Sequence, residues 1–185
     1  MVIDERQVKL KNGIEVTFKC PQEGDCPELL DFMRTVHSET EFMPRTLSEI
    51  DGITSEQQGE TLAAISESEQ AVMIAAFLDE EIIGYCVVDA ISEKSKFAHR
   101  AGLVISVKKR FWNIGLGTAL LNAATEFAFS AGFGQVEADV VSKNALGISM
   151  FRHNGFITAG MLPRAQRLSD GTYNDYISFV KYYKK

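Results

Sequence analysis

The amino-acid sequence predicts an α+β fold in which one sheet is interspersed with helices. Two turn signals, Lys11-Asn12-Gly13 and Ser169-Asp170-Gly171, each separate two strand-like runs, as in β-hairpins. Between them, apolar residues recur at helical spacing, most clearly over residues 116–131. No linker, repeat or low-complexity tract interrupts the 185 residues, so we expect a single domain, residues 1–185.

The first half of the chain contains four strand-like runs and two predicted helices. The strand-like runs cover residues 2–10, 14–18, 72–78 and 82–91. Apolar residues at helical spacing predict a helix over residues 27–38. Thr54 and Gln57 have the spacing of a capping box, which predicts a second helix that ends near Ser66.

The second half repeats the same kinds of element. Its strand-like runs cover residues 103–107, 136–141, 156–168 and 173–182. A helix over residues 116–131 has an apolar stripe and is expected to end at Gly132. A shorter helix over residues 144–153 has Asn154-Gly155 as its stop signal.

The bulk composition is that of an ordinary globular protein. Apolar residues make up 45% and charged residues 24% of the sequence. The net charge of −6 and the sequence pI of about 5.1 argue against general binding to nucleic acid or to an anionic membrane surface. This charge is compatible with cationic substrates such as amines.

Cysteine usage and the N-terminal segment both predict a cytoplasmic protein. Cys20, Cys26 and Cys86 are odd in number and form no C-x-x-C pair, which fits a reducing compartment and inert thiols. They also lack metal-ligand spacing, so no metal site is expected. We find no signal-peptide pattern and no apolar run of membrane-spanning length.

The most informative segment runs from Val107 to Leu121 and joins a predicted strand to a predicted helix. Gly115 and Gly117 stand where that helix begins. Glycine lets the backbone approach a ligand closely, and a helix N-terminus offers free N–H groups with positive dipole character. This combination favours binding of a phosphate or pyrophosphate group.

Two common phosphate-binding loops do not fit this segment. A Walker loop needs a lysine between its last glycine and the following serine or threonine, whereas Thr118 follows Gly117 directly. A dinucleotide fingerprint needs a third glycine where Leu120 stands, and it follows the first strand rather than the midpoint of the chain.

The segment instead resembles motif A of the GNAT superfamily of acyl-CoA-dependent N-acetyltransferases, whose signature is Q/R-x-x-G-x-G/A. The window from Trp112 to Gly117 matches it except that Trp112 replaces the usual Gln or Arg, which removes a polar side chain but no backbone donor. Asn144-Ala145 and the run from Met150 to Phe156 resemble motif B. Residues 99–107 and 162–176 resemble the branch related to ribosomal-protein N-terminal acetyltransferases.

This resemblance implies a GNAT-like mixed, largely antiparallel sheet of about six to eight strands, flanked by about four helices, with one splayed strand pair. It implies acetyl-CoA as cosubstrate, with the pantetheine arm in the splay and the pyrophosphate on the backbone amides of residues 113–118. The implied cofactor-binding residues are Ile105, Ser106, Val107, Trp112, Asn113, Ile114, Gly115, Leu116, Gly117, Thr118, Asn144 and Phe151.

The family pattern leaves the catalytic base open. Gly102 stands where the branch commonly carries a glutamate, so the usual base is missing. We name His99 as the substitute, with Asp89 and Glu137 as alternatives. A histidine near a strand start also has a structural interpretation.

The family pattern also leaves the general acid unassigned. Phe151 stands where the family usually has a tyrosine that protonates the leaving thiolate, and Tyr85, Tyr173 or a water are the candidates to replace it. Asn144 is the second catalytic candidate, through a contact to the pantetheine arm. It also suits a helix N-cap, and both roles can hold together.

Four other residues have two interpretations each. Lys108, Lys109 and Arg110 could meet the phosphates of coenzyme A or form a solvated turn. Cys86 could suggest an acyl-carrying thiol, but on a buried strand it is expected to be a small core residue.

The leading hypothesis is an N-acetyltransferase that moves acetyl from acetyl-CoA to a primary amine by direct attack. The acceptor is a small molecule or a peptide or protein N-terminus. One alternative, favoured by Gly102 and Phe151, is an acyl-CoA-binding sensor or interaction module without catalysis. Another is a nucleotide-binding protein unrelated to coenzyme A. The oligomeric state, monomer or homodimer, stays open.

Overall fold

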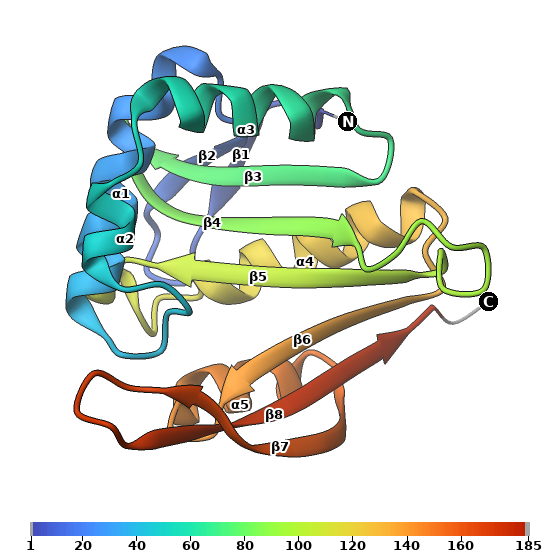
Figure 1. Ribbon diagram of the computed structural model, residues 1–185. Coiled ribbons are helices and arrows are strands. Elements are labelled where there is room, and N and C mark those ends of the chain that lie inside the picture. Colours follow the sequence, from blue (N-terminus) through green and yellow to red (C-terminus); the bar gives the residue numbers. More distant parts are fainter. Residues whose placement is uncertain (1, 184–185) are drawn as a thin grey trace.

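The computed structural model describes residues 2–183, which form an eight-stranded sheet with helices on both faces (Figure 1). The strand order is β1-β2-β3-β4-β5-β6-β8-β7, and every neighbouring pair is antiparallel except β5 and β6. The strands are β1 (Arg6–Lys9), β2 (Glu15–Lys19), β3 (Ala71–Leu78), β4 (Glu81–Ala90), β5 (Arg100–Val107), β6 (Gln135–Val141), β7 (Ile157–Arg167) and β8 (Tyr173–Tyr182). The predicted α+β, largely antiparallel sheet is therefore confirmed.

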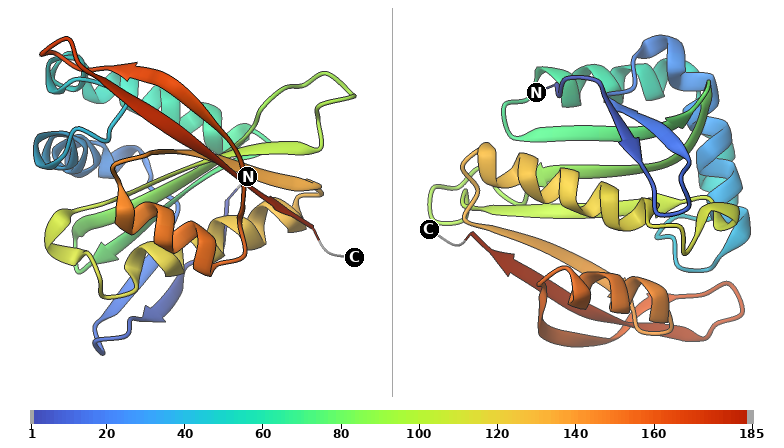
Figure 2. Two further views of the ribbon diagram at one scale, coloured as in Figure 1. Left: turned by 90° about the horizontal axis from the view of Figure 1, so that it is seen from below. Right: turned by 180° about the vertical axis from the view of Figure 1, so that it is seen from behind.

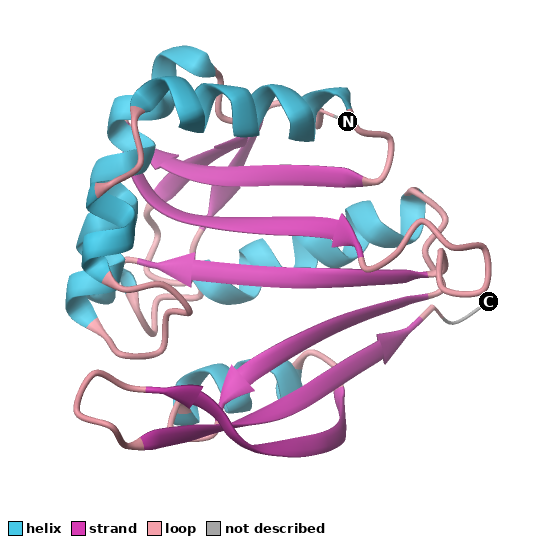
Figure 3. Ribbon diagram, in the orientation of Figure 1, coloured by secondary structure: helices cyan, strands magenta, loops and turns pink. Residues whose placement is uncertain are grey.

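Five α-helices lie on the two faces of this sheet within residues 2–183 (Figures 2 and 3). They are α1 (Cys26–Glu39), α2 (Leu47–Asp51), α3 (Ser55–Glu67), α4 (Leu116–Ser130) and α5 (Ala145–His153), and the short 3-10 helices are η1 (Glu23–Asp25) and η2 (Lys109–Phe111). Helices α1 to α3 cover one face, and α4 and α5 cover the other. None of the helices described is both long and apolar enough to cross a membrane.

Helix α2 is the element that the sequence interpretation missed. Thr46 caps it: its hydroxyl accepts the N–H of Glu49 at 3.3 Å, and the Glu49 carboxylate accepts the N–H of Thr46 at 2.6 Å. This Thr-x-x-Glu spacing is a capping box and was available in the sequence. Strand β1 is also shorter than the predicted run over residues 2–10.

Helix α4 is held against the sheet by the apolar stripe that its sequence predicts. Leu120 and Leu121 are completely buried between the helix and strands β4 and β5. Burying a leucine side chain stabilises a fold by about 1.5–3 kcal/mol. Gly132, at φ +91°, follows the last turn as expected, because a left-handed residue at that point lets the chain leave the helix.

Strands β5 and β6 splay apart, which is the feature that positions the site. Their pairing ends where Gly102 lies opposite Glu137, although β5 continues to Val107. Beyond that point β5 stays paired only with β4, and β6 stays paired with β8 along its length. The two strands therefore open like a fork, as Figure 1 shows.

Candidate active site

The fork opens into a cavity of about 1170 Å³ that collects most of the predicted site residues. The predicted residues that line it are Ile105, Ser106, Val107, Trp112, Asn113, Gly115, Gly117, Thr118, Asn144 and Phe151. The side chain of Leu116 is buried in the core, and that of Ile114 packs against it. These two residues can therefore face a ligand only through their backbone.

The backbone of β5 presents unpaired polar groups to the fork. The N–H of Lys108 donates to the carbonyl of Ile83 on β4 at 3.0 Å, whereas the carbonyl of His99 accepts from Gln135 at the start of β6 at 3.1 Å. Backbone groups alternate in direction along a strand, so even positions of β5 bond to β4 and odd positions face β6. Ile105 thus directs its N–H and C=O into the open fork.

The loop before α4 forms a cradle of free N–H groups. Asn113 (φ +63°) and Gly115 (φ +91°) are both left-handed, and Gly115 is the N-cap of α4 without any side-chain cap. None of the backbone N–H groups of residues 113–118 donates a hydrogen bond to another group within residues 2–183. Free amides at a helix N-terminus are a ready anion site.

Trp112 contributes a polar contact that the sequence did not predict. Its indole N–H donates to the carbonyl oxygen of Val107 at 2.9 Å. The substitution of Gln or Arg by Trp therefore does not leave this position without a polar side chain. The bond ties the start of the cradle to the end of β5, which keeps the two ligand-facing segments in a set relative position.

Asn144 has the N-cap role that its residue type favours. Its Oδ1 accepts the N–H of Gly147 at 2.9 Å, at the start of α5. Gly147 leaves room for this contact, because a Cβ atom there would lie 2.8 Å from Nδ2 of Asn144. Phe151 on the same helix is buried, stacked on Phe179 and edge-to-face with Phe156, and it also touches the cavity.

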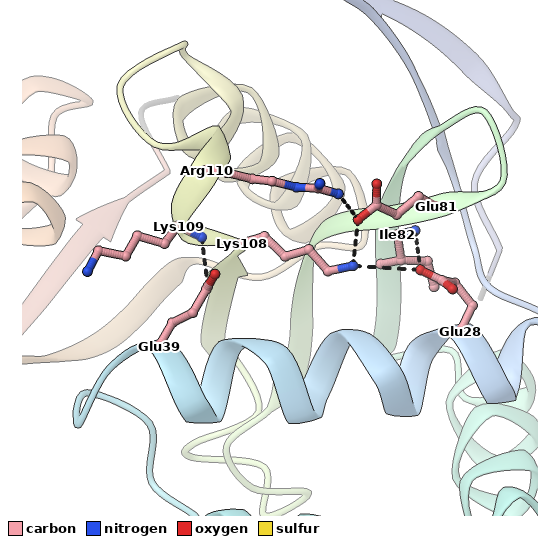
Figure 4. A network of polar contacts seen from close by, with 7 residues as sticks. All are labelled: Glu28, Glu39, Glu81, Ile82, Lys108, Lys109 and Arg110. Atoms are coloured by element: carbon pink, nitrogen blue, oxygen red, sulfur yellow. Dashed lines mark hydrogen bonds and ion pairs between the residues drawn. The ribbon is translucent and has the colours of Figure 1, made fainter.

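Two of the three basic residues before the cradle, Lys108 and Arg110, form ion pairs outside the cavity lining, whereas the side chain of Lys109 is exposed (Figure 4). The ammonium of Lys108 is buried and lies 2.7 Å from the Glu81 carboxylate and 3.8 Å from that of Glu28, and Arg110 also pairs with Glu81. The backbone N–H of Lys109 donates to Glu39 at 2.7 Å. Both sequence interpretations of Lys108, a contact to a coenzyme A phosphate and a solvated turn, are therefore wrong.

The Glu81 carboxylate is the centre of that network. Burial opposes its ionisation, but the hydrogen bonds and positive charges of Lys108 and Arg110 outweigh this effect and hold its pKa below the ordinary value. The network therefore fastens the end of β5 to β4 and, through Glu28, to α1.

Three positions form a row across the fork on the face opposite α4. Asp89 on β4 lies directly opposite Gly102 on β5, which in turn lies opposite Glu137 on β6. Arg100 holds the Glu137 carboxylate through two contacts, Nε–Oε1 at 2.5 Å and Nη2–Oε2 at 2.8 Å. These hydrogen bonds outweigh burial and lower the pKa of Glu137. Asp89 lines the cavity and has no ion pair within the described residues.

His99 is not brought to the cavity. It stands just before β5, its side chain is exposed, and its ring and Cβ lie beside Gly134. Its carbonyl oxygen accepts the N–H groups of Gly134 and Gln135 at 2.8 and 3.1 Å. The position is that of a residue that holds the start of β6, and the catalytic role of His99 stays a prediction.

The tyrosines are arranged differently from the expectation. Tyr85 is buried outside the cavity lining, and Tyr173 is exposed beneath the guanidinium of Arg164. Tyr176, which the sequence did not single out, lines the cavity from β8. Burial, and to a lesser degree the charge of Asp139, raises the pKa of its hydroxyl. Only the register of β8 against β6 reveals this residue.

A polar bridge joins the loop after α1 to the β7–β8 hairpin beside the cavity. The Gln166 side chain donates to the carbonyl oxygen of Met43 at 2.8 Å, and Asn174 donates to Gln166 at 3.0 Å. Met43 also contacts Ser106 on β5, with 3.6 Å between sulfur and hydroxyl. Three segments that are distant in the sequence therefore meet over the fork.

No thiol or metal cluster is found in this part of the molecule. Cys86 is buried against α4, where desolvation raises its pKa far above the ordinary range, and it does not line the cavity. Across residues 2–183, no three His, Cys, Asp or Glu side chains are grouped so that they could hold a metal ion.

The comparisons with known proteins agree with this geometry. The sequence model of the Acetyltransferase (GNAT) family matches residues 32–156. An acetyltransferase of the GNAT family from Streptococcus pneumoniae is 27% identical, with a TM-score of 0.83 over 91% of this chain and 99% of its own. No protein of curated function matches the sequence significantly.

Two further solved structures share the fold. Ribosomal-protein-alanine N-acetyltransferase from Brucella melitensis is 21% identical, with a TM-score of 0.79 over 90% of this chain and 99% of its own. The protein yncA from Salmonella typhimurium, solved with its cofactor acetyl-CoA, is 15% identical, with a TM-score of 0.80 over 92% and 95% of the two chains. The family match spans the fork, the cradle and helix α5, and on these grounds the chain belongs to the acetyltransferase (GNAT) family.

Proposed function

We propose that this protein transfers an acetyl group from acetyl-CoA to a primary amine of a small molecule or of a peptide or protein N-terminus. The observation that carries the proposal is the continuity of the unpaired β5 edge at Ile105 with the cradle of residues 113–118 in one cavity. An amide-bearing arm can add to the strand edge, and a pyrophosphate can meet the cradle.

The residues around the thioester have separate roles in this proposal. The N–H of Ile105 would polarise the thioester carbonyl, and such an oxyanion donor contributes about 3–4 kcal/mol to the transition state. Asn144 would contact the pantetheine arm through its amide while its Oδ1 caps α5. Attack by the amine is direct, because Cys86 is buried outside the cavity and cannot carry the acyl group.

The amine must lose a proton before it attacks. At pH 7, deprotonation costs about 4–5 kcal/mol for an amine of pKa about 10.4, and about 1 kcal/mol for an α-amine near 8. We propose Asp89 as the base, acting directly or through water. Side chains directly opposite in an antiparallel pair have Cβ atoms about 4.5–5.5 Å apart, so Asp89 can place its carboxylate near the position of the glutamate missing at Gly102.

The experiment removes the carboxylate from β4 at Asp89 and then places one on β5 at Gly102. Asp89→Asn should lower turnover of amines of high pKa, measured as thiol release from acetyl-CoA, while coenzyme A binding is retained. Adding Gly102→Glu should restore part of the loss, since a Cβ atom at Gly102 has only ordinary contacts at 3.7 and 3.8 Å. His99→Gln is the matched test of the histidine. Full activity of Asp89→Asn together with loss in His99→Gln would reassign the base to His99.

The second candidate function is an acyl-CoA-binding sensor without catalysis, which Gly102 and Phe151 favour. Trp112 is the sole tryptophan of the chain and lines the cavity, so its fluorescence should report the binding of coenzyme A. A fluorescence change without thiol release on any amine or peptide of a broad panel would support the sensor. ATP or NAD binding with no response to coenzyme A would contradict both proposals.

A further inference from the structure

The β1–β2 turn lies against the cradle although about a hundred residues separate the two in the sequence. The backbone N–H of Lys11 donates to the carbonyl oxygen of Ile114 at 3.2 Å. The turn is itself held by Gly13 (φ +87°) and by Asn12, whose side chain accepts the N–H of Ile14 at 3.2 Å. Lys11 therefore projects from an ordered turn that is docked on the loop.

The side chain of Lys11 passes over the N-cap of α4. A Cβ atom at Gly115 would lie 3.1, 3.3 and 3.6 Å from Cγ, Cδ and Cε of Lys11, so the lysine stem runs along this residue. Lys11 also lines the cavity of the fork. Its ammonium is thus carried to the end of the site where the free amides of residues 113–118 lie.

The ammonium of Lys11 lies at the cavity without an ion pair to any described residue, unlike the charged groups of Lys108 and Arg110. Lys108 pairs with Glu81 and Glu28, and Arg110 pairs with Glu81, while Lys109 is exposed and does not line the cavity. Within residues 2–183 the Lys11 ammonium forms no ion pair. The chain has a net charge of −6, so an unpaired cation beside the cradle is a local exception. Together with the free amides it favours the binding of an anionic ligand group.

We propose that Lys11 binds a phosphate group of coenzyme A and so extends the site to the β1–β2 turn. The inference rests on coenzyme A being the cosubstrate in the proposed function. The cradle amides are neutral donors, whereas the ammonium adds a full positive charge that a diphosphate or a 3′-phosphate can pair with. The sequence could not point to Lys11, because nothing local distinguishes it from any other lysine in a hairpin turn.

The test compares Lys11→Gln and Lys11→Arg with Lys9→Gln. Lys9 is exposed on the same hairpin and outside the cavity lining, so its replacement removes the same charge without touching the site. Lys11→Gln should weaken coenzyme A binding, followed by Trp112 fluorescence or calorimetry, by about 2- to 5-fold at low salt and less at high salt. Lys11→Arg and Lys9→Gln should bind as the wild type does.

Dephospho-coenzyme A separates the two phosphate sources. An equal loss of affinity for both ligands in Lys11→Gln assigns the lysine to the diphosphate, and a loss for coenzyme A alone assigns it to the 3′-phosphate. Wild-type affinity of Lys11→Gln for both ligands, or an equal loss in Lys9→Gln, would overturn the inference. Failure of the wild-type protein to bind coenzyme A would instead overturn the proposed function.

Discussion

Trp112 and Val107 are joined by a 2.9 Å hydrogen bond from the indole N–H to the backbone carbonyl oxygen. Val107 ends β5 and Trp112 begins the cradle, so this bond links the strand edge proposed for the pantetheine arm to the amides proposed for the pyrophosphate. The contact also explains how a tryptophan can occupy a position where Gln or Arg is usual. It supplies a side-chain donor that holds the loop and uses none of the cradle amides.

Replacing Gly115 should weaken coenzyme A binding, and not only lower the stability of the fold. Gly115→Ala places a side chain at φ +91° and brings its Cβ within 3.1 Å of the Lys11 stem. The left-handed strain costs about 1–2 kcal/mol. Gly132→Ala is the matched control, since Gly132 has the same φ at the other end of α4 and nothing within 4 Å of its Cβ position. Both variants should lose similar stability in thermal denaturation, and only Gly115→Ala should lose coenzyme A affinity. Equal affinities would contradict the cradle.

The two roles of Asn144 can be separated by its replacements. Asn144→Ser keeps an N-cap acceptor without adding charge but removes the amide donor, whereas Asn144→Ala removes both. We expect the alanine variant to lose about 1 kcal/mol of unfolding free energy and the serine variant much less. Both should raise the KM for acetyl-CoA in steady-state assays. A wild-type KM in Asn144→Ser would restrict Asn144 to the cap.

Tyr176 is the structure's candidate for the acid that Phe151 cannot provide. Burial raises the pKa of its hydroxyl, so Tyr176 stays protonated in the neutral range and can donate a proton there. Tyr176→Phe should lower kcat by about 100-fold, the low end for a general acid, because a thiol of pKa about 8.5 leaves readily. Affinity for coenzyme A should not change.

Tyr173→Phe is the control for Tyr176, because Tyr173 lies outside the cavity beneath Arg164. Its kcat should equal that of the wild type at every pH. An unchanged kcat in Tyr176→Phe would show that Tyr176 is not the acid, and that water protonates the leaving thiolate.

Glu81 should stabilise the fold in a pH-dependent way. Its folded-state pKa lies below the ordinary value, so its contribution is complete above the unfolded pKa of about 4.3 and is lost as pH falls through the lower folded value. Glu81→Gln leaves the buried Lys108 with Glu28 at 3.8 Å. We expect a loss of about 1–3 kcal/mol in the free energy of unfolding at pH 7, reduced by the one-third exposure of Glu81. This loss should shrink as the pH falls through the lowered folded-state pKa of Glu81. A difference that does not depend on pH would exclude this ion pair as the cause.

Local sequence patterns determined most of the secondary structure and the resemblance to the family. The turn signals around residues 11–13 and 169–171, the apolar stripe of α4 and the stop at Gly132 all depend on neighbouring residues, and the structure has each of them. The glycines that begin α4 identified the family for the same reason, because a cradle of backbone amides needs consecutive residues. Even the missed helix α2 had a local signal in Thr46 and Glu49.

Tertiary structure alone decided which further side chains join the predicted ones in the cavity. Asp89 lies opposite Gly102 through strand register, Tyr176 enters through the pairing of β8 with β6, and Lys11 reaches the cradle from the first hairpin. The same packing turns Lys108 into an internal partner of Glu81 and leaves His99 outside the cavity. These outcomes depend on contacts between residues that are distant in the chain. A sequence pattern records local conformational preference, and it does not record which distant elements that preference will bring together.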